Sequence, residues 1–285
     1  MTFLLFCGII SASKKNEEGH SVPTEKMTLK KYIDKEYTKE KRRARATYRA
    51  RLREVKAAHS IRLEDYYLKT GAPRPVNPPK RAVLEEIGNS VTHGLGAIFA
   101  VYALYMMLRA ADGAREITSA VIYFFGMFTA FSVSCIYHAL PYGSAAKRLF
   151  RRFDYSSIYL LIGATFAPVL LAFFNNRFGI IFFIVQWAVI ALGITLVAVF
   201  GPSRLRYIHI PLYVVLGWSA LMLLPGMIAE SYLLAVWILA GGIAYTLGVL
   251  PYAIKVRASH FIWHFFVLLG AVLQCFGIYV YVFLG

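Results

Sequence analysis

The stretch FGIIFFIVQWAVIALGITLVAVF, residues 178–200, decides the fold of this chain because it contains no charged residue. A helix of about 20 apolar residues is long enough to span the hydrocarbon core of a bilayer. Since an open sheet would leave unpaired backbone groups in lipid, such a run predicts a helix. Similar runs cover residues 89–110, 117–140, 156–174, 207–227, 231–254 and 261–284. The sequence therefore predicts an all-α integral membrane protein, a bundle of seven transmembrane helices.

The composition supports this prediction and excludes other classes of protein. Apolar residues make up 58% of the chain and charged residues 16%, whereas soluble domains average about 45–50% and about 25%. An ordinary soluble domain and a disordered chain are therefore excluded. The net charge of +16 suggests a nucleic-acid partner, but its distribution argues against one: residues 1–81 carry 20 Lys+Arg and 9 Asp+Glu, and residues 82–285 carry 11 and 6.

The basic residues between the predicted spans indicate the orientation of the chain. Loops on the cytoplasmic side of a membrane protein carry an excess of Lys and Arg. One side has only Arg109, Arg115 and Arg177. The side of the N-terminus has eight: Lys147, Arg148, Arg151, Arg152, Arg204, Arg206, Lys255 and Arg257. We expect a multi-pass protein of the cell membrane with a cytoplasmic N-terminus and a C-terminus outside.

The change from a polar N-terminal part to an apolar remainder predicts three regions in the chain. Residues 1–27 are expected to be a disordered leader, with Met27 as an alternative start. Residues 28–81 predict a basic amphipathic helix followed by a Pro-rich linker, and residues 82–285 form the transmembrane domain. Such a helix can bind the anionic lipids of the inner leaflet, or it can be a solvated extension. A nucleic-acid role does not fit a segment tethered to a membrane.

Polar residues within the predicted spans are the candidates for function, because burying an ionisable group in a membrane costs free energy. The predicted topology puts all of them at one depth, near the cytoplasmic side. They are Glu86, Asn89, His93, Ser134, His138, Asp154, His209, His260 and His264. Structural polar residues have no reason to share one level.

The spacing of these residues predicts a metal site. His260 and His264 lie four residues apart, as do Ser134 and His138, so each pair shares one helix face. Three imidazoles from two helices are typical ligands of a catalytic zinc ion. Asp154 is expected to orient a ligand or to accept a proton from water. Zinc in such a site activates water for attack on an amide or ester carbonyl.

The remaining polar residues have two interpretations each. Glu86, Asn89 and His93 share one face of the first span, where they either support the metal ligands or cap the start of the helix. His209 lies near Arg204 and Arg206, and it is expected to be an interfacial anchor rather than a ligand.

Four motifs together resemble the hemolysin III family. They are EEIGNSVTHGLGA (residues 85–97), SVSCIYHALP (132–141), FRRFDYSSIYLLIGATFAP (150–168) and HFIWHFFVLLG (260–270). This family is grouped with the progestin and adipoQ receptors and with the alkaline ceramidases, which are intramembrane hydrolases. The resemblance covers residues 82–285 and implies a seven-helix bundle with a zinc ion near the cytoplasmic side.

The resemblance also implies roles for individual residues. The metal histidines of the family fall on His138, His260 and His264. Its motif aspartate and serine fall on Asp154 and Ser134, and its first-span glutamate and asparagine fall on Glu86 and Asn89. Two positions depart from the family pattern, because Tyr155 and Gln274 stand where many members have histidine.

The function expected from the residues and from the resemblance is zinc-dependent hydrolysis of a lipid amide or ester, of the ceramidase type. Asp154 is the expected base, and Ser134 is expected to bind the water or the oxyanion. The alternatives are a lipid-sensing receptor with structural zinc and a cytolysin. A pore is disfavoured, since the later spans carry almost no charge along their length.

Overall fold

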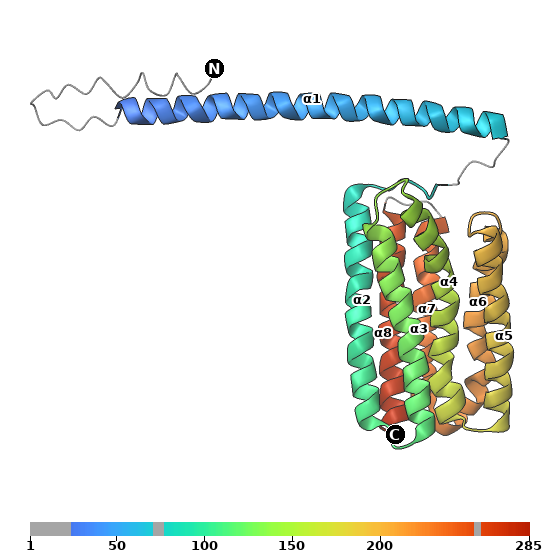
Figure 1. The fold of residues 1–285 in the computed structure, drawn as a ribbon. Helices are drawn as coiled ribbons and strands as arrows, with labels where there is room; N and C mark the ends of the chain where they lie inside the picture. Colours follow the sequence, from blue (N-terminus) through green and yellow to red (C-terminus); the bar gives the residue numbers. More distant parts are fainter. Residues whose placement is uncertain (1–23, 71–76, 254–257) are drawn as a thin grey trace, which may run out of the picture. The chain divides into compact units, whose positions relative to one another are not determined.

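The computed structural model describes residues 24–70, 77–253 and 258–285, and every regular element in these ranges is a helix (Figure 1). The chain divides into two units, residues 1–75 and 76–285. The all-helical class predicted from the sequence is therefore confirmed for the described residues. The predictions for residues 1–23, for residues 71–76 of the Pro-rich linker, and for the loop charges Lys255 and Arg257 lie outside these ranges.

The described part of the first unit, residues 24–70, is one long helix, α1 (Thr24–Thr70). It begins four residues before the predicted start at residue 28. Nearly all of its described side chains are exposed, and these include the apolar residues Ile33, Tyr48 and Val55. Binding of this helix to anionic lipids stays a prediction.

The described residues of the second unit form seven longer helices and three short ones. The longer helices are α2 (Val83–Ala110), α3 (Ala114–Ala139), α4 (Ala145–Ala167), α5 (Arg177–Phe200), α6 (Arg206–Trp218), α7 (Leu224–Ala253) and α8 (Ser259–Ile278). The short ones are the π-helix η1 (Pro168–Phe173), the 3-10 helix η2 (Ser219–Leu223) and the π-helix η3 (Tyr279–Phe283). The helices lie side by side along one direction (Figure 1).

Six segments among the described residues are long and apolar enough to cross a membrane. Five of them correspond to single predicted spans, whereas Tyr207–Pro251 contains both the fifth and the sixth. Ser231 lies within this segment and has a non-helical backbone, with φ −155° and ψ 92°. The structure therefore supports a multi-pass membrane protein, and the count of seven stays a prediction.

The start of α4 differs from the prediction. The sequence predicted a loop with Lys147, Arg148, Arg151 and Arg152 before a span at residue 156, but these residues lie inside α4. The helix begins earlier because the Ser144 side chain accepts a hydrogen bond of 3.0 Å from the backbone N–H of Lys147. An apolar run marks the part of a helix that lies in lipid, and it does not mark the ends of the helix.

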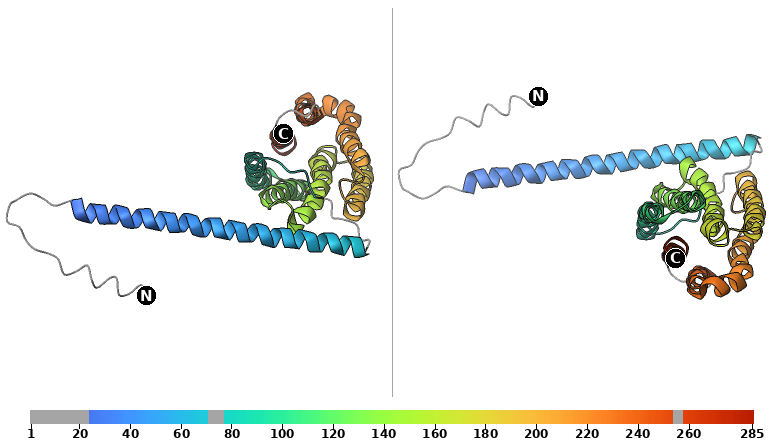
Figure 2. Two further views of the ribbon diagram at one scale, coloured as in Figure 1. Left: turned by 90° about the horizontal axis from the view of Figure 1, so that it is seen from above. Right: turned by 90° about the horizontal axis from the view of Figure 1, so that it is seen from below.

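Close packing joins the helices that carry the predicted site. Helix α3 packs between α2 and α4, and α8 lies between α2 and α7 (Figure 2). A Cβ atom at Gly126 of α3 would lie 2.2 Å from the Ala164 Cβ and 2.6 Å from the Leu160 carbonyl oxygen of α4. Such small residues let helices approach closely in membranes. The arrangement brings the cytoplasmic-side ends predicted for α2, α3, α4 and α8 together.

Candidate metal centre

Three histidines from two helices converge at one point of the second unit. His138 lies near the end of α3, and His260 and His264 lie one turn apart in the first two turns of α8. The Nε2 atom of His260 is 3.3 Å from Nε2 of His138 and 3.1 Å from Nε2 of His264. Potential ligand atoms of all three residues lie within 4.8 Å of one another.

Residues of α2 contact the Nδ1 edge of the His138 ring, on the side away from His260. Nδ1 of His138 hydrogen-bonds to the Glu86 carboxylate and lies 3.3 Å from Nδ2 of Asn89. When the Nδ1–H donates to Glu86, the Nε2 atom carries the free lone pair that a metal requires. Glu86 and Asn89 therefore contact a predicted ligand, and their support of a metal site stays a prediction.

Lys147 completes this part of the site, although the sequence pattern does not predict its role. Its side chain is buried, and its Nζ donates to the backbone oxygens of Tyr137 and Leu140, each at 3.0 Å, and of His138 at 3.4 Å. The same Nζ lies 3.3 Å from a Glu86 carboxylate oxygen. Lys147 therefore binds the C-terminal end of α3 and the carboxylate that orients His138. In the sequence, Lys147 is one of several basic residues in a predicted loop, and nothing there indicates this role.

The geometry of the three histidines fits a zinc ion. Tetrahedral zinc with Zn–N bonds of about 2.0–2.1 Å holds two ligand nitrogens about 3.3 Å apart. The two Nε2 separations of 3.3 Å and 3.1 Å are close to this value. Three imidazoles with a carboxylate behind one of them are also the donor set expected for zinc. The residues present therefore suit this ion.

Two other predicted residues lie outside the group of three. His93 is buried, and its ring lies 3.8 Å from that of His264 between centroids, tilted by 31°. Neither ring nitrogen of His93 has a hydrogen-bond partner in the described part of the chain. His209, expected to be an interfacial anchor rather than a ligand, lies outside the group and is fully buried, with Nδ1 3.0 Å from the Tyr159 hydroxyl.

A cavity of about 390 Å³ extends from this group into the bundle. His260, His264, Ser134 and Asp154 line it, and Asp154 hydrogen-bonds to Ser134 through their side chains. Most of the remaining wall is apolar, from α4, α6, α7 and α8. Cavities of this size that combine apolar walls with a few polar groups are typical ligand sites. The two residues predicted to be catalytic therefore share one cavity with two predicted ligands.

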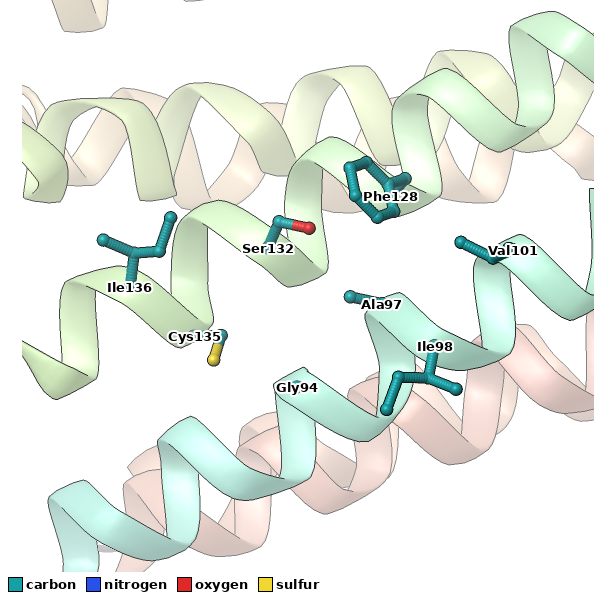
Figure 3. A pocket seen from close by; sticks show the side chains of 8 residues that line it. All are labelled: Gly94, Ala97, Ile98, Val101, Phe128, Ser132, Cys135 and Ile136. Carbon is teal, nitrogen blue, oxygen red and sulfur yellow. The ribbon is translucent and has the colours of Figure 1, made fainter.

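A second hollow, of about 340 Å³, lies between α2 and α3 (Figure 3). Figure 3 shows apolar side chains such as Ile98, Val101 and Phe128 along it, together with Cys135 and Ser132. The residues that line it include no group of acid, base and metal-ligand side chains. The chemistry therefore belongs to the first cavity.

Comparison with known proteins agrees with this geometry. The sequence profile of a family described as haemolysin-III related matches residues 81–275, which contain all the predicted site residues. The chain belongs to the haemolysin-III related family. The resemblance inferred from the four motifs is therefore confirmed.

Curated relatives of this haemolysin-III related chain cover most of its second unit. It is 31% identical over 208 residues to Hemolysin-3 of Bacillus cereus, covering 70% of this chain and 93% of that protein. It is 29% identical over 204 residues to a Hemolysin-3 homolog of Bacillus subtilis, covering 70% and 95%. It is also 25% identical over 213 residues to the human monocyte to macrophage differentiation factor, covering 72% and 87%.

The two positions that depart from the pattern of many haemolysin-III related proteins lie in different places. Tyr155 lines the cavity beside Asp154, and its backbone oxygen accepts a 2.8 Å hydrogen bond from the Tyr213 hydroxyl. Gln274 also lines the cavity, but it is ten residues beyond His264 on α8. Since ten residues of helix span about 15 Å, Gln274 is far from the histidine group.

The buried position of Lys147 gives a prediction about stability. Lys147→Met keeps a chain of similar length but removes the charge that pairs with Glu86 and three carbonyl oxygens. We expect the free energy of unfolding to fall by about 3 kcal/mol, because breaking a buried ion pair leaves its partner uncompensated. Equilibrium unfolding in mixed detergent micelles measures this value. Arg148→Met, at an exposed neighbour, is the control, and an equal loss in both variants would contradict the assignment.

Proposed function

We propose that this protein is a zinc-dependent membrane hydrolase that cleaves a lipid amide or ester. One observation carries the proposal: three histidine Nε2 atoms meet at the end of a mainly apolar cavity that Asp154 and Ser134 also line. The name of a relative such as Hemolysin-3 does not say which reaction takes place at this site. The chemistry is therefore argued from the residues themselves.

His138, His260 and His264 would hold the ion. Glu86 fixes the orientation of His138 by accepting a hydrogen bond from its Nδ1–H, Asn89 lies beside the same nitrogen, and Lys147 holds Glu86 in place. Outer contacts of this kind set the tautomer of a ligating histidine and contribute about 10- to 100-fold to metal affinity. When bound, zinc would supply a Lewis acid that polarises a carbonyl and activates water.

Asp154 and Ser134 are assigned to proton transfer and to binding of the oxyanion. A carboxylate in the cavity can accept a proton from the attacking water and return it to the leaving nitrogen or oxygen. The C–N or C–O bond then breaks, and the products are a carboxylic acid and an amine or alcohol. Ser134 hydrogen-bonds to Asp154, so its hydroxyl can orient that carboxylate or bind the carbonyl oxygen of the substrate.

The substrate class follows from the walls of the cavity. Side chains such as Leu161, Phe166, Leu223, Ile238 and Val267 line it below the polar end. An apolar chain gains free energy when such walls bury it. Lipid amides of the ceramide type, and lipid esters, combine such a chain with a carbonyl group near its polar head.

We also propose that residues 207–251 cross the membrane twice, which gives seven crossings in total. A continuous helix of 45 residues would be about 67 Å long, about twice the thickness of the hydrocarbon core. Ser231 interrupts the helix near the middle of this segment. Helix α6 packs on α4 and α5, whereas α7 packs mainly on α8. When the loops rich in Lys and Arg lie in the cytoplasm, seven crossings correspond to a cytoplasmic N-terminus and a C-terminus outside the cell membrane.

Metal content tests the first step of the proposal. Purified protein should contain about one zinc ion per chain, as measured by inductively coupled plasma mass spectrometry, because three imidazoles suffice to hold it. His264→Ala should lose most of it, and Glu86→Gln should weaken zinc affinity by about 10- to 100-fold. His209→Ala is the matched control, since this buried histidine lies outside the group. Wild-type protein without zinc would refute the site.

Hydrolysis of defined lipids tests the second step. We expect zinc-loaded protein in nanodiscs to release fatty acid from a ceramide or an ester panel, and Asp154→Asn to slow this by at least about 100-fold, as for loss of a general base. Zinc content of Asp154→Asn should stay unchanged, because Asp154 is not in the ligand group. Zinc binding without hydrolysis of any panel member would instead favour a receptor with structural zinc.

Thiol labelling tests the double crossing. In a chain whose native cysteines are replaced by serine, Glu230→Cys lies beside the Ser231 break and should react with a membrane-impermeant maleimide on intact cells. Tyr142→Cys, in the exposed connection between α3 and α4, should react only after the cells are permeabilised. Labelling of Tyr142→Cys but not of Glu230→Cys on intact cells would reverse the orientation.

A further inference from the structure

The cavity that begins at the histidine group ends in a second set of polar side chains. Gln274 of α8, Tyr245 of α7 and Thr165 of α4 line its far end. None of them belongs to the group that could hold a metal. The hydrolase proposed above requires none of them, so their presence in an otherwise apolar wall needs a separate explanation.

Two helices give the same distance between the two polar ends. On α8, Gln274 follows His264 by ten residues, which is about 15 Å of helix. On α4, Thr165 follows Asp154 by eleven residues, which is about 16 Å. The wall between them is mainly apolar and includes Leu161. The cavity therefore has polar side chains at both ends and a mainly apolar middle.

Glycines in the packed helices make room for the far-end side chains. A Cβ atom at Gly241 of α7 would lie 2.3 Å from Cγ of Gln274, and one at Gly270 of α8 would lie 2.9 Å from the Tyr245 ring. Any larger residue at either position would displace these side chains. The sequence of α7 and α8 therefore accommodates Gln274 and Tyr245 in their observed positions.

At the far end of the cavity, some side-chain donors and acceptors form no hydrogen bond within the described residues. The Gln274 Nε2 donates to the Ile238 carbonyl oxygen at 3.1 Å, which uses only one of the bonds that a side-chain amide can form. The hydroxyl group of Tyr245 is buried and has no hydrogen-bond partner among the described residues. Buried polar groups without a partner cost free energy, so a bound polar group here would be stabilised.

We propose that the far end binds a hydroxyl group carried on the chain of a lipid whose polar head lies at the histidine end. The separation of about 15 Å corresponds to about twelve carbons of an extended chain, which places the hydroxyl near the twelfth carbon. Gln274 and Tyr245 are then specificity residues for hydroxylated chains. The proposal rests on the proposed function only in placing the polar head beside the histidines, and it requires no hydrolysis.

A competition experiment with two simple acids tests this inference. Purified zinc-treated protein in detergent receives an equimolar mixture of dodecanoic acid and 12-hydroxydodecanoic acid, and native mass spectrometry measures the ratio of the two bound forms. We expect wild-type protein to favour the hydroxylated acid by about five-fold, as one hydrogen bond in an apolar site gives. Gln274→Leu should remove most of this preference. Tyr245→Phe removes a single oxygen, keeps the packing, and should lower the preference as well.

Gln186→Leu is the matched control, because Gln186 is a buried glutamine that lies near Ser219 and does not line the cavity. Its preference should equal that of the wild type. An equal ratio in wild type, Gln274→Leu and Tyr245→Phe would overturn the proposal and would mean that water serves these groups. Failure of wild type to bind either acid would overturn it too. Neither probe has an amide or ester bond, so loss of hydrolase activity would leave this result unaffected.

Discussion

The carboxylate of Glu86 is the point on which the rest of the site depends. A negative charge in a membrane-spanning segment is costly unless it is paired. Glu86 lies between Nδ1 of His138 and the ammonium group of Lys147, and it therefore joins α2 to α3 and α4. The same contacts determine which nitrogen of His138 faces His260. One ion pair thus positions three helices and prepares one ligand at the same time.

Much of the candidate site is predictable from the sequence because the site is built on helices. Residues four apart on a helix share a face, so spacing alone pairs His260 with His264 and Ser134 with His138. Hydropathy identified every helix that crosses the bundle, apart from the division of residues 207–251. The alternating direction of successive spans then placed all these polar groups at one end.

Other features of the site depend on contacts between residues that are far apart in the sequence. The spacing of residues along a helix does not predict such contacts. Lys147 looked like one of several loop charges, because nothing local shows that its ammonium group turns back to α3 and Glu86. His209 was expected to be an interfacial anchor because two arginines lie near it in the sequence, but its side chain is buried and its Nδ1 lies 3.0 Å from the Tyr159 hydroxyl. Gln274 stood out in the sequence only as a departure from the expected family pattern, but the rise of α8 carries it to the opposite end of the cavity from the histidines.

The order of the ligands along the chain has a consequence for biosynthesis. The contacts among Glu86, His138 and Lys147 lie within α2, α3 and α4, which leave the ribosome before α8 and can pair with one another early. His260 and His264 lie in α8, which is made after all the other spans. A nascent chain therefore carries one prepared histidine, which is too weak a ligand set to retain zinc. If the site binds zinc as proposed, metal loading would therefore have to wait until α8 has been made and inserted.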